Sequence, residues 1–352
     1  MRIAVVGATG NVGTSVLRAL AVDPRIEYVR GIARRLPRFQ QAKTEFVAAD
    51  VVHCKLEPLF DGMDAVIHLG WRIQSAHRPR ELELSNVRGS ERVFDAVERT
   101  GVPTLLYSSS VGAYSPGPKD QSVSESYPTL GVSTSLYSTQ KAKVERLLDA
   151  LETRKPSLRV VRFRPALIFK RDAATEIRRL FAAPWVPRVL FSKRLLRVVP
   201  YHPRFCFQAV HSFDVGEAFR LALHADVRGA FNLAAEPILN SAVIAEALHA
   251  RLVAVSPNVM RTVASISWHL RLQRSDPGWV DLCLQSPLID STRARTELGW
   301  APLRSGVSAL LELLDGIRDD AGISTPPLAP SLGKGTSTHW LRLAHGAKQE
   351  RE

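Results

Sequence analysis

Residues 6–13 read VGATGNVG and place Gly7, Gly10 and Gly13 three residues apart, after a short apolar run and at the start of a helical pattern over 11–21. Glycines at this spacing permit a tight turn, a close approach of the backbone to a pyrophosphate, and close packing of helix on strand. The first N–H groups of a helix lack partners inside it and attract phosphates. The stretch therefore predicts a strand–turn–helix unit that binds a dinucleotide, with a ligand-free glycine turn as the alternative.

Short apolar, β-rich runs alternate with helical patterns along the first half of the chain. We expect strands at 3–6, 26–33, 44–48, 65–69, 104–108 and 159–163, and helices at 11–21, 80–100 and 137–153. Such alternation is typical of a parallel sheet covered by helices on both faces. The sequence therefore predicts an α/β fold, a Rossmann-type doubly wound parallel sheet with a smaller C-terminal substrate-binding lobe.

The pattern becomes looser after the first 170 residues. We expect an NAD(P)-binding core over 1–170 with returning segments near 206–235, and a mainly substrate-binding lobe over 171–315 that is helical at 240–272. From residue 324 to 352 proline, glycine, serine and threonine dominate, which predicts a disordered tail.

The composition is that of an ordinary globular protein, with 45% hydrophobic and 23% charged residues among 352. Three widely spaced cysteines and scattered histidines predict neither a disulfide framework nor a metal site. No window approaches the roughly 18 apolar residues of a membrane span, and the apolar run at the N-terminus is too short for a signal peptide. We expect a soluble, cytoplasmic protein without an integral membrane segment.

The formal net charge is +13. A positive balance suits nucleic acid, an anionic membrane surface or a phosphorylated substrate, although a general abundance of arginine explains it equally. No basic stretch interleaved with aromatic residues is present, so we expect no nucleic-acid partner.

Tyr137 and Lys141 lie four residues apart in SLYSTQKAKVE, residues 135–145, so on a helix they share one face, whereas Lys143 lies on another and is solvated. A nearby ammonium, together with an oxidised nicotinamide ring, would favour the phenolate and lower the tyrosine pKa from about 10. A surface pair is the alternative. Three serines, 108–110, end a predicted strand at the edge of the sheet where ligands bind in such folds.

These motifs resemble the extended short-chain dehydrogenase/reductase superfamily, in particular the NAD-dependent epimerase/dehydratase family, over roughly residues 1–315. Further similar stretches are Asp50-Val51, HLGW at 68–71, Asn86 in SNVRG, FRP at 163–165, VHSFDV at 210–215 and ELGWAP at 297–302. Gly70 and Trp71 depart from the family's small pair. The resemblance implies a cofactor site formed by Gly7, Thr9, Gly10, Asn11, Val12, Gly13, Arg34, Asp50, Val51, Leu69, Gly70, Trp71, Asn86, Ser108, Tyr137, Lys141, Phe163 and Pro165.

The resemblance also implies catalytic roles. Ser110 matches the catalytic serine or threonine because Tyr114 follows it in the family's SSxxxY pattern, Tyr137 is the acid/base, and Lys141 also holds the nicotinamide ribose. Family members that dehydrate nucleotide sugars carry Asp-Glu directly after this serine. Val111 and Gly112 stand there, which disfavours dehydration. The absence of a GxSxG elbow argues against a serine hydrolase.

The expected second strand ends in Ala33 where an NAD site usually carries an acid, and Arg34 and Arg35 follow. A guanidinium pairs well with a 2′-phosphate, so the sequence favours NADP over NAD. Solvated loop arginines are the alternative.

Two enzymatic functions stay open. One is an epimerase or oxidoreductase acting at a hydroxyl or keto carbon of a nucleotide-sugar-like substrate, whose diphosphate would be held by arginines such as Arg178, Arg179, Arg188 or Arg204. The other is an NADPH-dependent reductase of a hydrophobic carbonyl compound. The segment 178–205 would then form an apolar lid, a membrane-surface contact, or only a solvated basic face.

A non-catalytic, dinucleotide-binding regulatory protein is a further alternative. Relatives in the family commonly form homodimers through the helices that correspond to those carrying Asn86 and Tyr137, so a homodimer is expected.

Overall fold

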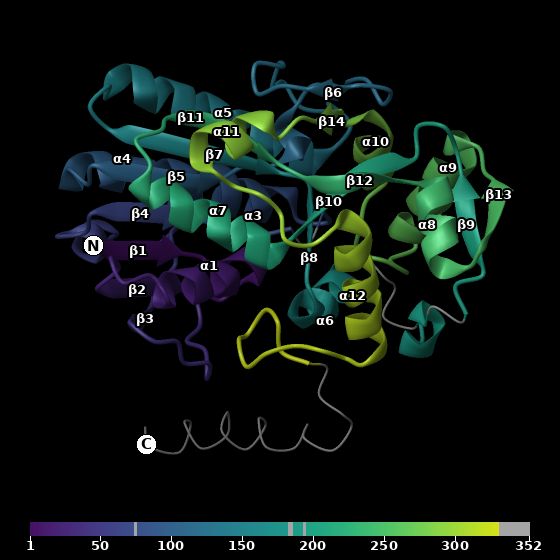
Figure 1. The fold of residues 1–352 in the computed structure, drawn as a ribbon, viewed down its shortest axis with the longest axis horizontal. Helices are drawn as coiled ribbons and strands as arrows, with labels where there is room; N and C mark the ends of the chain where they lie inside the picture. The colour runs from purple at the N-terminus through teal and green to yellow at the C-terminus, as the bar shows by residue number, and fades with distance from the viewer. Residues whose placement is uncertain (74–75, 182–185, 193–194, 331–352) are drawn as a thin grey trace, which may run out of the picture.

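The computed structural model describes residues 1–73, 76–181, 186–192 and 195–330. Its centre is a sheet of seven parallel strands (Figure 1). From one edge to the other these are β11 (Gly229–Leu233), β7 (Arg159–Pro165), β5 (Thr104–Ser108), β4 (Ala65–His68), β1 (Arg2–Val6), β2 (Tyr28–Ala33) and β3 (Thr44–Ala48). The predicted doubly wound α/β fold is confirmed.

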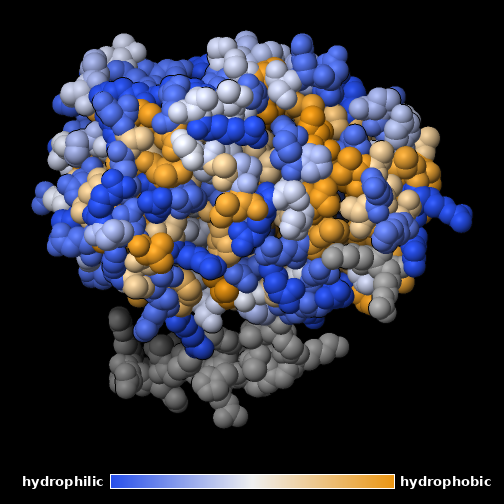
Figure 2. Space-filling model, viewed as in Figure 1, coloured by the Kyte–Doolittle hydropathy of each residue, from blue (hydrophilic) through white to orange (hydrophobic). Residues whose placement is uncertain are grey.

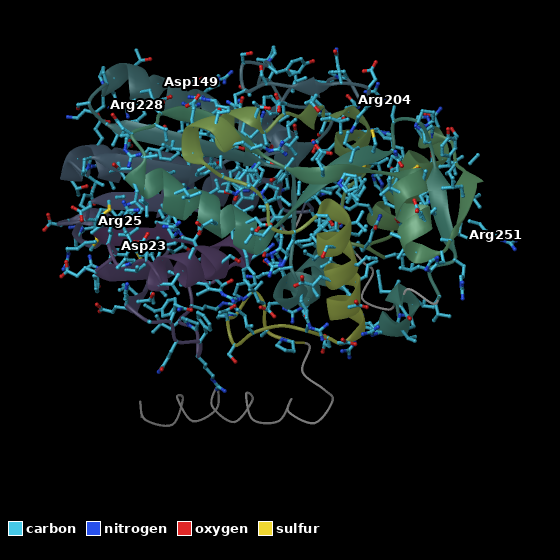
Figure 3. The ribbon with its side chains drawn as sticks, viewed as in Figure 1. Asp23, Arg25, Asp149, Arg204, Arg228 and Arg251 are labelled. Carbon is cyan, nitrogen blue, oxygen red and sulfur yellow. The ribbon has the colours of Figure 1, made fainter. Side chains whose placement is uncertain are left out.

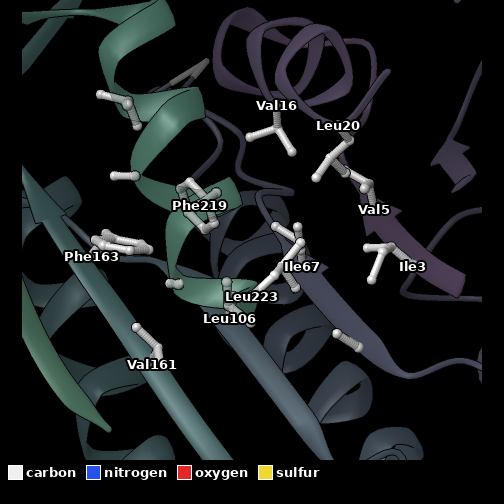
Figure 4. Packing of buried hydrophobic residues seen from close by; sticks show 14 of the residues in the cluster. Ile3, Val5, Val16, Leu20, Ile67, Leu106, Val161, Phe163, Phe219 and Leu223 are labelled. Atoms are coloured by element: carbon white, nitrogen blue, oxygen red, sulfur yellow. The ribbon is translucent and has the colours of Figure 1, made fainter. Parts of the chain in front are cut away.

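Alternate residues of β1 enter two different cores, because successive side chains of a strand point to opposite faces. Ile3 and Val5 pack with α1 (Asn11–Ala21) and α7 (Ser212–His224), as Figure 4 shows. Ala4 and Val6 pack on the other face with α2 (Glu57–Phe60), α4 (Gly89–Thr100) and α5 (Leu136–Arg154). Both faces of the sheet are therefore buried, which explains why its strands are continuous apolar runs.

The strand order reverses between β1 and β4. The chain runs outward through β2 and β3, then returns to β4 and continues on the other side through β5, β7 and β11. In open parallel sheets a crevice forms at such a reversal, beyond the carboxyl ends of the strands. This topology places the loops after β1, β2, β3 and β4 around one cleft.

Two of the stretches that resemble family motifs, ELGWAP and VHSFDV, contact each other in the core. Trp300, in ELGWAP, is buried against α1 and α7, and its indole N–H donates to the carbonyl of Asp214 at 2.7 Å. The Arg304 N–H donates to the carboxylate of the same aspartate, which lies in VHSFDV. The short helix α11 (Thr292–Leu298) packs on β11 and α7 and ends at Gly299, whose φ of +63° suits glycine.

A second group of elements forms the lobe beside the sheet (Figure 1). Its strands are β8 (Leu167–Phe169), β10 (Cys206–His211) and β12 (Ala235–Asn240) in one sheet, β9 (Val198–Tyr201) with β13 (Arg251–Ala254), and β6 (Ser122–Val123) with β14 (Leu288–Ile289). Its helices are α6 (Ala174–Phe181), α8 (Ser241–Leu248), α9 (Pro257–His269), α10 (Gly278–Gln285) and α12 (Gly306–Arg318). Short helical turns occur at η2 (Val111–Ala113), η3 (Arg171–Ala173) and η4 (Arg188–Phe191).

Two predicted helices are irregular. The helix expected at 80–100 consists of α3 (Pro79–Glu83), a π-helical turn, η1 (Leu84–Arg88), and α4. The helix expected at 240–272 is wrong as one element, because α8 ends at His249 in a left-handed conformation and β13 follows before α9. Pro257 cannot lie inside a helix without clashing with the preceding turn, so it starts α9 instead.

The prediction of a disordered tail from residue 324 is wrong for residues 324–330. The carbonyl of Ser324 accepts hydrogen bonds from the N–H groups of Arg38 and Phe39 at 3.0 and 3.1 Å, and Thr325 and Leu328 are buried. Apolar contact and backbone pairing order this segment in spite of its composition. The remainder of the predicted tail, residues 331–352, lies outside the described residues.

Candidate active site

A cleft of about 400 Å³ opens at the reversal of strand order, where the dinucleotide site is predicted. Among the predicted cofactor residues, those that line it are Gly7, Thr9, Gly10, Arg34, Asp50, Val51, Leu69, Gly70 and Trp71. They come from the loops after β1, β2, β3 and β4. Sequence analysis thus located residues from four separate loops in one cleft.

The three glycines of the first loop occupy structurally different environments. Gly7 has a φ of +85°, and a Cβ there would lie 2.7 Å from the nitrogen of Gly70. A Cβ on Gly13 would lie 2.3 Å from the carbonyl oxygen of Gly7, so α1 packs this closely only with glycine. A Cβ on Gly10 would meet only that same oxygen, at 3.6 Å. Gly10 therefore leaves the cleft open at the N-terminus of α1, where unpaired N–H groups suit phosphates.

Positive side chains gather at the end of the cleft formed by the loop after β2. Arg34 and Arg35 line it, together with Arg72 from the loop after β4. The pKa of the Arg34 guanidinium is lowered, first by partial desolvation and then by the positive charge of Arg72, whereas Asp50 opposes the shift. An anion bound here would relieve this repulsion. The residues present therefore fit an additional phosphate at this end.

Asn86 has a different position from the one predicted. It is buried, and its amide oxygen accepts from the N–H of Arg72 at 2.7 Å while its amide nitrogen donates to the Arg72 carbonyl at 2.9 Å. The same nitrogen donates to Gln140 of α5 at 2.9 Å. Asn86 thus fixes the loop after β4 to the Tyr137 helix and does not line the cleft.

Eight other predicted cofactor residues lie outside the cleft lining: Asn11, Val12, Gly13, Ser108, Tyr137, Lys141, Phe163 and Pro165. Phe163 is fully buried in the core against Phe219 and Phe231, and Val12 packs on the same core. Pro165 ends β7, and the amide of Asn11 donates to the carbonyl of Ile168 at 3.2 Å.

Tyr137 and Ser110 meet as predicted. Ser135 caps α5 and accepts a hydrogen bond from the N–H of Ser138, which places Tyr137 in the first turn of the helix. The side chains of Tyr137 and Ser110 lie close enough to interact, and Ser110 opposes the rise of the Tyr137 pKa. Gly112 permits the contact, because a Cβ there would lie 2.9 Å from the Tyr137 ring. A strand end and a helix start thus bring two hydroxyl groups together.

Lys141 follows Tyr137 by one turn of α5, and its side chain is buried. Its ammonium donates to the carbonyl of Ser108 at 2.8 Å and to the hydroxyl of Tyr107 at 3.3 Å, and lies 3.7 Å from the centroid of the Trp71 ring. Burial lowers its pKa from about 10.5 to about 7, although the charge of Glu145 opposes the shift. Ser108 therefore serves the site through its main-chain oxygen.

The lowering of the Tyr137 pKa, predicted for Lys141 acting together with an oxidised nicotinamide ring, is not produced by the side chains alone. Burial raises this pKa to about 12, with the hydrogen bond from Ser110 as an opposing effect. The ammonium of Lys141 contacts the Ser108 carbonyl and the Trp71 ring, and burial is the largest effect on the Tyr137 pKa. The raised pKa favours the neutral phenol, which is the form that can donate a proton.

Two tryptophans enclose Tyr137. Trp71 contacts its ring edge to face at 5.9 Å, and Trp279 lies against it at 4.9 Å between centroids. A cavity of only about 10 Å³ remains beside the tyrosine, lined also by Leu82 and Leu136. This holds roughly one water molecule.

Residues 71–73 line both this small cavity and the large cleft. They form the wall between the two spaces.

A buried ionic cluster under the site was not predicted. Glu145 accepts from Ser109 at 2.5 Å, from Arg162 at 2.9 Å, and from Arg164 at 3.0 and 2.8 Å. Burial alone would raise the pKa of Glu145, but the two arginines outweigh it and lower the pKa to about 2. The signal was present in the sequence, since Tyr137, Lys141 and Glu145 follow one another at intervals of four on one helix face.

The arginines suggested as diphosphate ligands have other partners here. Arg178 and Arg204 donate to main-chain carbonyls, and Arg188 pairs with Asp320 at 2.7 Å. Arg179 lines the large cleft and donates to the Ala329 carbonyl. Within the segment 178–205, residues 182–185 and 193–194 lie outside the described residues.

Over the described parts of the chain, no group of three or more histidines, cysteines and carboxylates is placed to hold a metal ion. In the same residues no helix has the length and apolar character needed to cross a membrane.

Comparison with known proteins places this site in a family. Residues 3–234 match the family described as the NAD-dependent epimerase/dehydratase family. The chain belongs to this family of enzymes. The matched region contains the glycine loop, the serine strand end and the Tyr137 helix.

Uncharacterized proteins of Mycobacterium tuberculosis H37Rv and Mycobacterium bovis are each 28% identical to the chain over 349 residues. The match covers 98% of this chain and 32% of either protein, so the chain spans about a third of the length of these relatives.

Solved structures of family enzymes share the fold. A UDP-glucose 4-epimerase of Stenotrophomonas maltophila with bound NAD and formylated UDP-arabinopyranose has a TM-score of 0.68 at 19% identity, covering 91% of this chain and 98% of that one. A UDP-glucuronic acid 4-epimerase of Bacillus cereus in complex with NAD has a TM-score of 0.67 at 16% identity, covering 91% and 99%. At such identities the likeness shows the common fold.

Proposed function

We propose that the chain is an NAD(P)-dependent oxidoreductase or epimerase that transfers hydride and a proton at a hydroxyl or keto carbon. The observation that carries the proposal is that Ser110 and Tyr137 lie side by side next to Gly112, with the buried Lys141 one turn along the Tyr137 helix and a glycine-lined cleft beyond residues 71–73. A bound nicotinamide would supply or accept the hydride. The membership in the NAD-dependent epimerase/dehydratase family supports this chemistry.

The side chains of the site would bind the substrate oxygen, donate the proton and stabilise the phenolate that results. Ser110 would hold the substrate oxygen by a hydrogen bond, and the neutral Tyr137 phenol would donate its proton to that oxygen in the reducing direction. Lys141 would favour the phenolate that is left, since a nearby ammonium stabilises it. Trp71 and Trp279 would exclude water around the tyrosine, which strengthens these interactions.

For the cofactor we propose NADP(H). The support is the group of guanidinium side chains from Arg34, Arg35 and Arg72 at the end of the cleft, and Ala33 in place of an acid. Solved relatives of the same fold are complexes with NAD, which is the competing assignment.

For the substrate, two classes differ in the observation that favours them. A nucleotide sugar is favoured by the solved relatives, whose complexes contain UDP-glucuronic acid or other UDP sugars. A hydrophobic carbonyl compound is favoured by the apolar surroundings of Tyr137 and by the engagement of Arg178, Arg188 and Arg204 in other contacts. The homodimer and the cytoplasmic location stay predictions from the sequence.

The first experiment identifies the nucleotide. The purified chain is denatured, any released nucleotide is identified by mass spectrometry, and the unliganded protein is titrated with NADPH and NADH while tryptophan fluorescence is recorded. We expect NADPH to bind at least about ten-fold more tightly, a difference of about 1.4 kcal/mol. Tightly retained NAD⁺ would instead overturn the NADP assignment and support an epimerase.

The second experiment separates the substrate classes. The protein is incubated with UDP-glucose or UDP-glucuronic acid, and in parallel with NADPH and a panel of apolar ketones. Interconversion of a UDP sugar without net cofactor consumption identifies an epimerase, whereas stoichiometric oxidation of NADPH by a ketone identifies the reductase. Failure to bind any dinucleotide would overturn both and leave the non-catalytic alternative without its ligand.

A further inference from the structure

The helix α9 has an unusual position in the lobe, because none of its 13 residues is buried. Val259, Val263, Ile266 and Leu270, the last directly after the helix, follow at intervals of four, three and four. This spacing places them in one stripe along the helix. Their exposed fractions are 55%, 61%, 56% and 64%. An aliphatic stripe of this length thus faces away from the protein.

The exposed apolar surface continues into the strand pair before the helix. Val198 and Tyr201 on β9 are 57% and 46% exposed, and Leu252 and Val253 on β13 are 44% and 46% exposed. β13 pairs with β9 and leads into α9 after two residues. Hydrophobic side chains gather over this end of the lobe in Figure 2. We call α9, β9 and β13 together the apolar end of the lobe.

The segment that contains β13 and α9 carries only positive formal charges. Residues 247–275 contain Arg251, Arg261, Arg271 and Arg274 and neither aspartate nor glutamate. Arg261 pairs with Asp281 at 3.0 Å on the side toward α10. Arg251 extends outward from β13 (Figure 3), and Arg271 is exposed just beyond the stripe. Exposed arginines therefore lie on β13 and just beyond the C-terminal end of the aliphatic stripe.

We propose that the apolar end of the lobe docks on an anionic lipid bilayer, with α9 lying in the plane of the interface. A helix binds there when one face is aliphatic and cations stand at its margins, since the acyl boundary takes the apolar residues and anionic headgroups attract the arginines. A protein partner would need acidic groups of its own to match these arginines. An anionic bilayer supplies negatively charged headgroups over any contact area. The inference requires neither cofactor nor turnover and so stands independently of the proposed function.

The test is co-sedimentation of the full chain with vesicles. One set contains phosphatidylglycerol and phosphatidylcholine in equal parts, and the other contains phosphatidylcholine alone. At about 0.1 M salt we expect at least ten-fold tighter binding to the anionic vesicles, weakened by more salt because the attraction is screened.

The double variant Val263→Asp/Ile266→Asp places two carboxylates in the stripe and should lower anionic vesicle binding at least ten-fold. The matched control is Val22→Asp/Leu303→Asp, because these side chains are 79% and 85% exposed on other elements. Circular dichroism and thermal unfolding show whether each variant keeps its fold, which is expected since no changed residue is buried.

Equal binding by the stripe variant and the wild type would overturn the proposal, as would failure of the wild type to bind anionic vesicles. A chain ending at residue 330 provides a third arm. If it loses vesicle binding while the stripe variant retains it, the lipid contact belongs to residues 331–352 and the proposal fails. If the stripe variant instead converts an oligomer to a monomer in size-exclusion chromatography, without any vesicle binding by the wild type, the occupant is a second copy.

Discussion

The ammonium of Lys141 lies 3.7 Å from the centre of the Trp71 ring, with its charge held inside the protein between this ring and the Ser108 carbonyl. The family carries a small residue at the position of Trp71, so here an aromatic side chain covers the lysine. Burial holds the Lys141 pKa at about 7, well below that of a lysine in water. The charged form is therefore disfavoured in the folded state.

This relationship predicts how stability depends on pH. Between about pH 7 and about pH 10 the unfolded chain binds a proton on Lys141 that the folded chain has lost, so stability should rise with pH. The gain should be about 3–4 kcal/mol, from about 1.4 kcal/mol for each unit of pKa shift. Urea unfolding at a series of pH values measures it.

The change Lys141→Met should flatten this pH profile. Lys143→Met is the control, because Lys143 is exposed and pairs with Glu83 at 2.8 Å. A profile that is the same for Lys141→Met as for the wild type would contradict the assignment.

A second prediction concerns the ionic cluster under the site. Glu145→Gln leaves the buried Arg162 and Arg164 without their shared carboxylate, and breaking a buried pair costs about 3–5 kcal/mol. Urea midpoints should fall accordingly. Glu152→Gln, at a half-exposed partner of Arg162, should cost less than about 1 kcal/mol. Equal losses in the two variants would show that the cluster is not held by Glu145.

The same carboxyl predicts the response to acid. The folded pKa of Glu145, about 2, lies below its unfolded value, so its contribution is complete above about pH 4.3 and is lost as the pH falls toward 2. In Glu145→Gln this part of the acid unfolding profile should be missing. An unchanged slope between these pH values would contradict the shift.

A third prediction concerns cofactor preference. Arg34→Ala removes a guanidinium from the predicted 2′-phosphate end of the cleft and should weaken NADPH binding about 10- to 100-fold, with little effect on NADH. Fluorescence titration with both nucleotides measures the ratio. Arg80→Ala, on the exposed surface of α3, is the control for loss of positive charge alone. Parallel losses for NADPH and NADH would refute a role in choosing the phosphate.

A fourth prediction concerns residues 324–330. Pro326 and Pro327 line the cleft, and Ser324 holds the loop after β2 through its carbonyl. A chain ending at residue 330 should bind NADPH like the full chain. A chain ending at residue 323 should bind about ten-fold more weakly, since about 1–2 kcal/mol of backbone pairing to the cofactor loop is lost. Equal affinities of the two shortened chains would contradict the contact.

The elements that could be predicted are those whose conformation is determined by local residue patterns. The strands of the central sheet are buried on both faces and hence continuous apolar runs, and Gly7 and Gly13 leave no room for a Cβ. The proximity of Ser110 and Tyr137 could be predicted, because strand ends and helix starts share one edge of a parallel sheet.

The parts that could not be predicted depend on contacts between distant segments. Trp279 covers Tyr137 from 142 positions along the chain, and the orientation of Lys141 toward Trp71 follows from packing in three dimensions. Residues 324–330 were predicted to be disordered because their composition does not show which surface they pack against. The raised pKa of Tyr137 is a consequence of this burial and not of its sequence neighbours.

The central claim is that Tyr137 carries the proton, and the most direct measurement compares Tyr137→Phe with the wild type on whichever substrate the panel identifies. Turnover and the dissociation constant of the dinucleotide are measured on the same preparations. The account predicts that turnover falls by about 10²–10⁴, the usual contribution of a general acid, while the dissociation constant changes less than about three-fold. Turnover within about ten-fold of the wild type would contradict it.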